Sequence, residues 1–424
     1  MRFIYSWLIR IAAPVAFAVV LWRGVRDRGY WQGLAERFGL GRKLPSPSIW
    51  LHAVSLGEMS AAAPLVRALH SRYPQLALAV TSATPAGRAR AQNLFADFAD
   101  IRFLPYDTPG SVRRFLGRIQ PRVAVIMETE LWANLFRECE RLRIPLFLAS
   151  ARLSAKSVSR YRRLGGLFSS VFTPNVTVAA QTAEDAERFR LIGASANQTR
   201  VIGNVKYDLS VSDAIIEAGK ILRAAYGAKL VWVAGSTHAG EEDQVLQAHA
   251  LLQAHRPDSL LLLAPRHKDR FAAVADLLAR RGVKFARRSD MVDALPLDTQ
   301  VLLVDTIGEL LALYASADVA FVGGSLVPIG GHNLLEPAAL GLPVLTGPSH
   351  FNSREIALLL LRRGAALQVA NPEELAAALQ RLLDEPAESR RIGSIGKDLV
   401  ESNRGSVARL LALIEPSLPE AHRS

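Results

Sequence analysis

The chain has 424 residues, of which 50% are hydrophobic and 21% charged, so it is a globular protein and not a disordered one. Its net charge of +12 lies in the first half, because residues 1–210 hold 29 Lys and Arg against 14 Asp and Glu, whereas residues 211–424 hold 22 against 25. The basic half predicts an anionic partner, which nucleic acid, an anionic membrane or a phosphorylated lipid would supply, and the single cysteine, Cys139, excludes a disulfide within the chain.

The first long apolar segment, Phe3–Trp22, has about the length needed to cross a bilayer and contains only Ser6 and Arg10 as polar residues. Arg10 and Pro14 disfavour a simple spanning helix, and no small-residue cleavage site indicates a removed signal peptide. Three basic residues follow at once: Arg23, Arg26 and Arg28. The segment predicts a membrane anchor that spans the bilayer or lies in its interface, with the basic flank on the cytoplasmic side. A buried N-terminal helix is the alternative.

From Ser48 onward, short apolar segments alternate with helical patterns, which is typical of parallel sheets with crossover helices. In the first half the predicted strands are Ile49–Ala53, Leu76–Thr81, Arg102–Leu104, Val123–Met127, Pro145–Leu148, Val176–Ala180 and Arg200–Ile202. In the second half they are Leu230–Ala234, Leu260–Ala264, Lys284–Ala286, Val301–Val304, Val319–Val322 and Pro343–Leu345. The fold class is therefore α/β, with two doubly wound, Rossmann-like domains and a ligand between them at the carboxyl ends of the strands.

These segments suggest four parts: an anchor over residues 1–28, one Rossmann-like domain over 29–208, a second over 209–400, and a C-terminal helix and tail over 401–424. The last helix is expected at Glu401–Ile414 and the tail at Ala421–Ser424.

Two carboxylate-bearing segments follow strands of the first half. Glu58 comes after the first predicted strand, next to Gly57, and is a candidate general base; a first-turn glutamate favoured by the helix dipole is the alternative. Glu128 and Glu130 follow Val123–Met127, and crowding two carboxylates there indicates a role or a cationic partner, although a solvated loop would also accommodate them. Lys206 lies at the expected joint between the domains, where it would neutralise an acidic substrate or serve only as a linker residue.

In the second half, four strand ends carry glycine or polar residues: Gly235–His238, Pro265–His267, Thr306–Leu310 and Gly323–Glu336. The last contains two glycine pairs followed by a helical pattern, an arrangement that offers free backbone N–H groups and a positive helix end to a phosphate. A plain strand-to-helix turn is the alternative. Arg266 is a candidate for holding a phosphate or a carboxylate, and Glu336 for accepting from ribose hydroxyls. No cluster with metal-ligand spacing is evident, so no metal is expected.

The ordered motifs of the chain resemble those of bacterial 3-deoxy-D-manno-octulosonic acid (Kdo) transferases of lipopolysaccharide assembly. In the first half these are ERFG (from Glu36), HAVSLGE (from His52), TSATPAGR (from Thr81), ETELW (from Glu128), ARLSAKSVSRYRRLGG (from Ala151) and GNVKYD (from Gly203). In the second half they are AGSTHAGEE (from Ala234), PRH (from Pro265), GEL (from Gly308) and GGSLVPIGGHNLLEPAALG (from Gly323). The resemblance covers nearly the whole chain.

The resemblance implies a GT-B glycosyltransferase whose two domains face each other across a cleft, one binding the acceptor and the other the donor, CMP-Kdo. The acceptor would be the phosphorylated lipid A precursor, lipid IVA. The enzyme would be located at the cytoplasmic face of the inner membrane. No cofactor and no nucleic acid are implied. Glu58 matches the family's general base, and Glu128 and Lys206 match residues that support the transition state. The CMP-binding segments match Pro265, Arg266, Ile307, Gly308, Glu309, Asn333, Leu334, Leu335 and Glu336. Arg88, Arg90, Arg160, Arg162 and Arg163 are candidates for the acceptor surface, or else solvated helix arginines.

Two other functions are compatible with parts of the sequence. A nucleotide-sugar 2-epimerase would share the two-domain pattern but would need neither the anchor nor the basic first half. A non-catalytic membrane-surface binder would use the basic half alone and would not need Glu58, Arg266 or Glu336.

Overall fold

The computed structural model describes residues 2–163, 166, 169–209, 211–227, 230–291 and 294–420. The chain divides into two compact units, one formed by Met1–Asp208 with Asn403–Ser424 and the other by Leu209–Ser402. The expected tail, Ala421–Ser424, lies outside the described residues.

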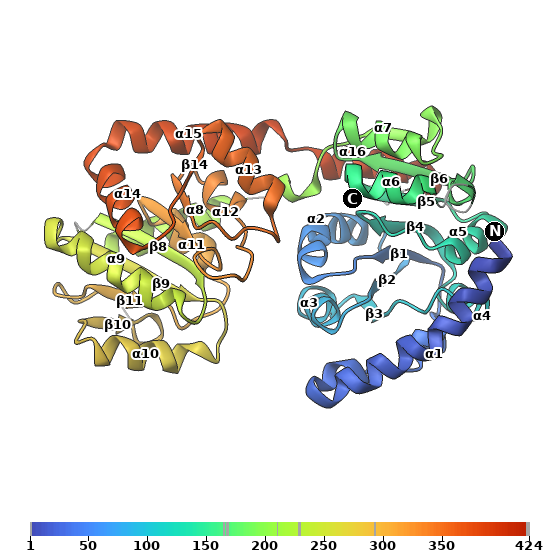
Figure 1. Cartoon of the computed structure of the whole chain (residues 1–424), viewed down its shortest axis with the longest axis horizontal. Coiled ribbons are helices and arrows are strands. Elements are labelled where there is room, and N and C mark those ends of the chain that lie inside the picture. The colour runs from blue at the N-terminus through green and yellow to red at the C-terminus, as the bar shows by residue number, and fades with distance from the viewer. Residues whose placement is uncertain are drawn as a thin grey trace. The chain divides into compact units, whose positions relative to one another are not determined.

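The first unit is built on a seven-stranded parallel sheet in the order β3-β2-β1-β4-β5-β6-β7 (Figure 1). Its strands are β1 (Ser48–His52), β2 (Ala77–Ser82), β3 (Ala99–Phe103), β4 (Pro121–Met127), β5 (Leu146–Ala151), β6 (Val176–Ala180) and β7 (Thr199–Val201). All five residues of β1 are buried, as expected for a strand covered on both faces. Ile49 and Leu51 join one core cluster and Trp50 the other, so successive side chains alternate between the two helical layers.

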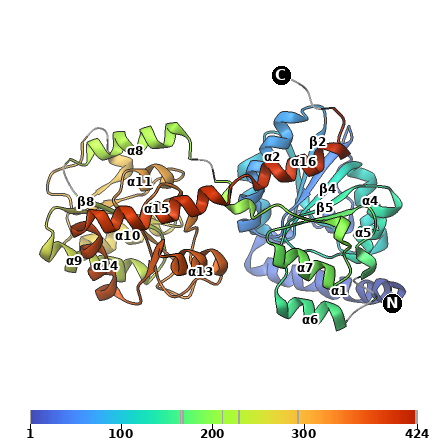
Figure 2. The ribbon, with the colours of Figure 1, turned by 90° about the horizontal axis from the view of Figure 1, so that it is seen from above.

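The helices of this unit are α1 (Arg2–Arg26), α2 (Leu56–Arg72), α3 (Pro85–Phe95), α4 (Pro109–Ile119), α5 (Ala133–Arg141), α6 (Ala155–Arg163), α7 (Ala183–Leu191) and α16 (Ser406–Ile414). Short 3-10 turns are η1 (Arg28–Trp31), η2 (Glu36–Phe38), η4 (Ser169–Val171), η5 (Ala196–Gln198), η6 (Val205–Tyr207) and η8 (Glu415–Ser417). The C-terminal α16 packs beside α2, where Leu410 and Ile414 share a core cluster with Met59 (Figure 2). Asp208 fixes its start by accepting hydrogen bonds from the N–H groups of Gly405 and Val407.

The second unit holds another seven-stranded parallel sheet, in the order β10-β11-β9-β8-β12-β13-β14. Its strands are β8 (Leu230–Thr237), β9 (Ser259–Pro265), β10 (Phe285–Arg287), β11 (Val301–Leu303), β12 (Val319–Val322), β13 (Val344–Thr346) and β14 (Ala366–Gln368). Its helices are α8 (Asp213–Ala225), α9 (Glu241–His255), α10 (Arg270–Arg280), α11 (Leu310–Ala315), α12 (Leu335–Ala339), α13 (Arg354–Arg363), α14 (Pro372–Asp384) and α15 (Pro386–Ser402), with η7 at Arg288–Asp290. Two doubly wound parallel sheets are thus confirmed, and among the strands of the described ranges the sequence missed only β14.

In each sheet the strand order reverses at one point, and this positions the candidate sites. The first chain half winds outward from β1 to β3 and then returns to β4 on the other side of β1. The second winds from β8 outward and returns to β12 on the other side of β8. Ligands of open α/β sheets bind beyond the carboxyl ends of the strands at such reversals. Glu58 follows β1, Glu128 follows β4 and His238 follows β8.

Candidate active site

Glu58 lies in the first turn of α2, directly beyond the central strand β1. Oγ of Ser55, the N-cap of α2, accepts from the Glu58 N–H at 3.3 Å, and the Ser55 hydroxyl donates back to Oε1 of Glu58 at 3.0 Å. The N–H of Val54 donates to Oε2 of Glu58 at 2.9 Å. These reciprocal bonds resemble a capping box, and they hold the carboxylate in one orientation at the carboxyl end of β1.

Glu128 follows β4, which pairs directly with β1, and contacts a lysine from a distant segment. Its φ of 54° lies in the left-handed region, which non-glycine residues adopt only where the surroundings impose it. Oε1 of Glu128 lies 2.9 Å from Nζ of Lys206 in η6. The Lys206 N–H in turn donates to Oδ1 of Asn204 at 3.0 Å. The structure thus joins Glu128 and Lys206 into one ion pair.

A cavity of about 240 Å³ lies at the carboxyl ends of these strands. Its lining is formed by Glu58, Met127, Glu128, Thr129, Glu130, Arg152, Leu153, Ser154, Ser157 and Tyr161. Two of the predicted catalytic residues therefore share one cavity within the first unit, and Lys206 reaches it through its ion pair with Glu128. Three carboxylates in so small a space disfavour simultaneous ionisation.

The pKa values of two carboxyl groups in the cavity are raised. Burial raises the pKa of the Glu58 carboxyl, and the charge of Glu128 raises it further, whereas the Val54 N–H, Ser55 and the Lys206 charge lower it. Burial also raises the pKa of Glu130 to about 7, with added contributions from the charges of Glu58 and Glu128. Carboxyl groups with raised pKa values in a cavity are suited to act as general bases.

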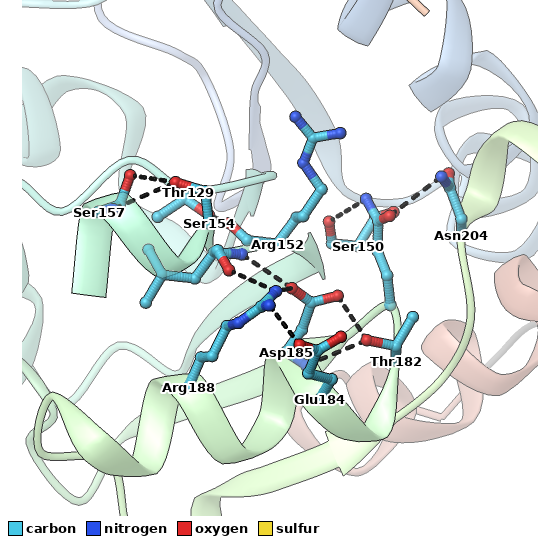
Figure 3. A network of polar contacts seen from close by, with 12 residues as sticks. Thr129, Ser150, Arg152, Ser154, Ser157, Thr182, Glu184, Asp185, Arg188 and Asn204 are labelled. Carbon is cyan, nitrogen blue, oxygen red and sulfur yellow. Dashed lines mark hydrogen bonds and ion pairs between the residues drawn. The ribbon is translucent and has the colours of Figure 1, made fainter. Parts of the chain in front are cut away.

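Arg152 also faces this cavity, at the end of a distorted strand. The register of β5 against β6 shifts between Ala149 and Ala151, and Ser150 has a φ of 53°. Such a β-bulge re-aims the residues that follow it. The bulged segment is fixed because the Leu153 N–H donates to Oδ1 of Asp185 at 3.0 Å and the Thr129 hydroxyl donates to the Arg152 carbonyl. Figure 3 shows the Arg152 side chain extending away from this network.

The second unit gathers basic side chains at the carboxyl ends of β8, β9 and β12. Nε2 of His238 lies 2.8 Å from Nε2 of His332, with their rings stacked at 5.1 Å between centroids, and the His267 ring meets that of His238 edge-on. Burial lowers the pKa of His332 to about 4, and the charge of Arg266 lowers it further. Burial lowers the pKa of His238 as well, followed by the charges of His267 and Arg266. In the Nε2–Nε2 hydrogen bond one ring donates and the other accepts, and a bound anion would favour protonation of these rings, so the cluster beside Arg266 is suited to a phosphate.

The glycine-rich loop after β12 does not offer its first N–H groups to a ligand, which corrects the expectation from the sequence. The carboxylate of Glu241, fully buried at the start of α9, accepts from the N–H groups of Gly324 at 2.6 Å, Ser325 at 3.0 Å and Leu326 at 2.9 Å. In the second glycine pair, the Gly330 N–H donates to Oγ of Ser349 and the Gly331 N–H donates to the Gly324 carbonyl. These donors shape the loop itself.

The remaining candidates for CMP binding present different groups. Pro265, Leu334 and Leu335 are buried, and Ile307 is 58% exposed beside Gly308, whose φ is 97°. Glu309 accepts from Nη2 of Arg288 at 2.9 Å, and Nδ2 of Asn333 donates to Oε1 of Glu336 at 3.1 Å. Among these residues, Arg266, Glu309, Asn333 and Glu336 keep polar side chains at least partly exposed beyond the strand ends.

Family models of known proteins match both halves of the chain. Residues 32–209 match the family model described as 3-deoxy-D-manno-octulosonic-acid transferase (kdotransferase), and residues 231–399 match that of glycosyl transferases group 1. The chain is 39% identical to the 3-deoxy-D-manno-octulosonic acid transferase of Haemophilus influenzae, over 98% of this chain and 99% of that protein. The chain belongs to the Kdo transferase family. It is also 38% identical to the transferase of the same name from Bordetella pertussis, over 98% of this chain and 99% of that one.

Members of the Kdo transferase family are glycosyltransferases, and this chain is therefore an enzyme of that class. Among solved structures, the UDP-GlcNAc 2-epimerase of Neisseria meningitidis matches with a TM-score of 0.57 and 13% identity, covering 87% of this chain and all of that one. A putative UDP-N-acetylglucosamine 2-epimerase from Listeria monocytogenes matches with a TM-score of 0.54 and 16% identity, covering 90% and 99%. These likenesses establish the GT-B type of fold alone, and the family decides against the epimerase alternative.

The structure adds residues to the candidate site that the sequence did not single out. Arg152, Ser157 and Tyr161 line the cavity beside Glu58, and His238 and His332 form the stacked pair of the second unit. Ser150, which turns Arg152 toward the cavity, has a left-handed backbone conformation. Such positions usually carry glycine, so a serine there does not indicate the turn in the sequence. Over the described ranges, which omit a few short segments, no group of three or more His, Cys, Asp or Glu side chains is placed to hold a metal ion.

Proposed function

We propose that this Kdo transferase moves Kdo from CMP-Kdo to a phosphorylated, acylated glucosamine disaccharide, the lipid A precursor lipid IVA, in lipopolysaccharide biosynthesis. The observation that carries the proposal is the oriented carboxylate of Glu58 in the cavity that also contains Glu128, paired with Lys206. A carboxyl group whose pKa is raised by burial is able to take the proton from an acceptor hydroxyl.

In the proposed reaction, Glu58 removes the proton of the acceptor hydroxyl as its oxygen bonds to the anomeric carbon of Kdo. The bond from that carbon to the phosphate oxygen of CMP breaks, and CMP leaves with the electron pair. Attack opposite the departing group inverts the anomeric centre. The ion pair of Glu128 and Lys206 would support the charge that develops on the sugar, and the Lys206 ammonium would balance the carboxylate of Kdo.

The second unit would bind the donor. Its basic cluster of Arg266, His238 and His332 lies beyond adjacent strands and is suited to the CMP phosphate, which carries a negative charge throughout the reaction. Glu336 and Asn333 are candidates for the ribose hydroxyls, and the backbone of residues 307–309 for the base. The reaction requires no cofactor beyond the donor substrate.

The enzyme would act at the cytoplasmic face of the inner membrane, where a lipid acceptor is embedded. Within α1, the 22 residues Tyr5–Arg26 are long enough to cross a membrane, and an 18-residue window among them reaches a mean hydropathy of 1.8. The excess of basic residues in the first unit suits both anionic lipid and a phosphorylated acceptor.

The proposal is tested by incubating the full-length protein with CMP-Kdo and lipid IVA in detergent and measuring product masses. We expect the acceptor to gain the mass of Kdo, with CMP released in equal amount. Release of CMP without a heavier acceptor, or conversion of the donor sugar alone, would contradict the transfer. Removing both acceptor phosphates tests the acceptor class, because the basic first unit predicts a large loss of turnover.

A further inference from the structure

Helix α1 contacts the first unit at its N-terminal end through two polar side chains. The Tyr5 hydroxyl donates to Oδ2 of Asp107 at 2.8 Å, and the Ser6 hydroxyl donates to Oδ1 of Asn134 at 2.7 Å. Asp107 is buried and also accepts from the N–H groups of Asn134 and Leu135, at 3.0 and 2.8 Å. The N-terminal end of α1 is therefore hydrogen-bonded to Asp107 and to the start of α5.

The same helix contacts the first unit at its middle and at its C-terminal end. The Phe17 ring packs edge-on against Phe38 of η2 at 5.1 Å between centroids. The Trp31 indole covers Gly24 so closely that a Cβ there would lie 1.9 Å from its nitrogen, and this nitrogen donates to the Leu21 carbonyl at 3.0 Å. Contacts from Ser6 to Gly24 extend over 18 residues, or roughly 27 Å of helix.

The side of α1 that faces the domain is narrow and partly polar. It consists of the residues that are less exposed than their neighbours: Tyr5, Ser6, Ile9, Ala13, Phe17, Val20 and Gly24. The opposite side carries the large apolar residues, with exposed fractions between 42% and 73%: Trp7, Leu8, Ile11, Val15, Val19, Trp22 and Val25. This is the reverse of an ordinary surface helix, which turns its apolar stripe toward the core.

We propose that α1 lies in the plane of the membrane interface, with its domain-facing side docked on the first unit and its exposed apolar side in the acyl layer, and that it does not span the bilayer. Docking and spanning exclude each other. A spanning helix would carry Tyr5 and Ser6 across a hydrocarbon core of about 30 Å, away from Asp107 and Asn134 in the folded domain. This inference rests on the membrane location proposed above.

The charges of α1 agree with an interfacial position. Arg10 is exposed within the helix, one turn from Trp7, and its guanidinium lies 5.5 Å from the Trp7 ring. In a spanning helix Arg10 would lie inside the hydrocarbon region, where a charged side chain is unfavourable. Arg26 lies 5.4 Å from the ring of Trp22 in the same way. Arginine and tryptophan pairs beside an apolar face fit the boundary between headgroups and acyl chains.

An anionic lipid surface fits this face better than a second copy of the chain does. The apolar side of α1 is bordered by Arg10, Arg23 and Arg26, and the first unit has an excess of basic residues. Two copies meeting through α1 would bring these like charges together, whereas anionic headgroups would neutralise them.

Cysteine labelling tests the topology with the full-length chain in intact spheroplasts. In a Cys139→Ala background, Arg2→Cys and Arg28→Cys place one thiol at each end of the helix. We expect a membrane-impermeant maleimide to label neither thiol in intact spheroplasts and both after permeabilisation. Labelling of Arg2→Cys alone in intact spheroplasts would show a spanning helix and overturn the inference. This readout needs no Kdo transfer, so it fails or succeeds independently of the proposed function.

Vesicle flotation tests the occupant of the exposed face. Ile11→Glu should lower binding to vesicles of phosphatidylglycerol and phosphatidylethanolamine by roughly tenfold or more, because it replaces an apolar side chain that would enter the acyl layer with a charged one. Ile221→Glu on α8 is the matched control, since Ile221 is 65% exposed and Ile11 67%, and it should bind as the unchanged protein does. Unchanged flotation of Ile11→Glu would overturn the inference, and a shift from dimer to monomer in that variant would assign the face to a second copy.

Discussion

Nζ of Lys206 lies 2.9 Å from Oε1 of Glu128, although the two residues are 78 positions apart in the chain. Glu128 reaches this position with a left-handed backbone beyond β4, and Lys206 approaches it from η6, after the last strand of the sheet. The pair therefore sets the charge beside Glu58: the Lys206 charge lowers the pKa of Glu58, and the Glu128 charge raises it.

Substitutions in this pair should move the pH dependence of transfer in opposite directions. Lys206→Met removes the charge that lowers the Glu58 pKa, so the acidic limb of the pH–rate profile should shift to higher pH. Glu128→Gln removes a charge that raises this pKa, so the limb should shift to lower pH. Both should also lose transfer by about 10²-fold or more, as expected when preorganised charge is removed. Lys206→Arg is the control, and an unmoved limb in both variants would show that the pair does not act on Glu58.

The ionised carboxylate of Glu130 should lower the free energy of unfolding. Its pKa is raised to about 7, so the wild type loses stability relative to a neutral variant as pH rises from about 4.5 to about 7. Glu130→Gln should therefore unfold at nearly the wild-type temperature at pH 4 and be more stable by about 1–3 kcal/mol at pH 8. Denaturant unfolding at both pH values measures this. A stability difference that does not depend on pH would contradict the raised pKa.

Arg266→Ala should weaken CMP and CMP-Kdo alike, because the proposed contact is to the nucleotide phosphate. A charge-assisted hydrogen bond is worth about 1.5–3 kcal/mol, so the dissociation constant should rise by roughly 10- to 150-fold. Lys268→Ala removes an exposed positive charge two residues further on and is the matched control. Isothermal titration calorimetry measures the dissociation constant for CMP. Equal affinity of Arg266→Ala and wild type would assign Arg266 to another role.

Glu241→Ala should destabilise the second unit, because it leaves the N–H groups of Gly324, Ser325 and Leu326 without their buried acceptor. The loss should be on the order of 3–5 kcal/mol. Asp243→Ala in the same turn of α9 removes only an exposed ion pair with Arg281 and should cost less than about 1 kcal/mol. Thermal unfolding of the two variants compares them, and similar midpoints would mean that the loop has other support.

Much of the fold follows from short-range patterns. The strand at Val319–Val322 is found with the predicted bounds, and the predicted Ile49–Ala53 differs from β1 by a single residue at each end. Strands buried on both faces are apolar throughout and bounded by turn residues, so they are visible in sequence. The missed strand, Ala366–Gln368, has three residues at the edge of the sheet and ends in an exposed glutamine, so it carries little pattern.

Candidate site residues could be named from the sequence where they come soon after a strand: Glu128 and Arg266 follow β4 and β9 directly, and Glu58 lies in the first turn of the helix after β1. The glycines at 323 and 324 suggested free phosphate donors, but the partner that takes their loop's N–H groups, Glu241, is more than 80 residues away. The position of a residue in the sequence does not show which distant buried group accepts the hydrogen bonds of such a loop. The same holds for Arg152, which a β-bulge turns toward the cavity through contacts made far along the chain.

The central claim is that Glu58 takes the proton from the acceptor hydroxyl, and its most direct test is the rate of Kdo transfer by Glu58→Gln across pH. Glutamine keeps the size of the side chain and an oxygen that can accept from the Val54 N–H, so folding and CMP binding should be unchanged. Transfer from CMP-Kdo to lipid IVA should fall by about 10²–10⁴-fold, and the acidic limb of the pH–rate profile should disappear. Near-normal transfer with the same acidic limb would contradict the claim and make Glu130 the next candidate.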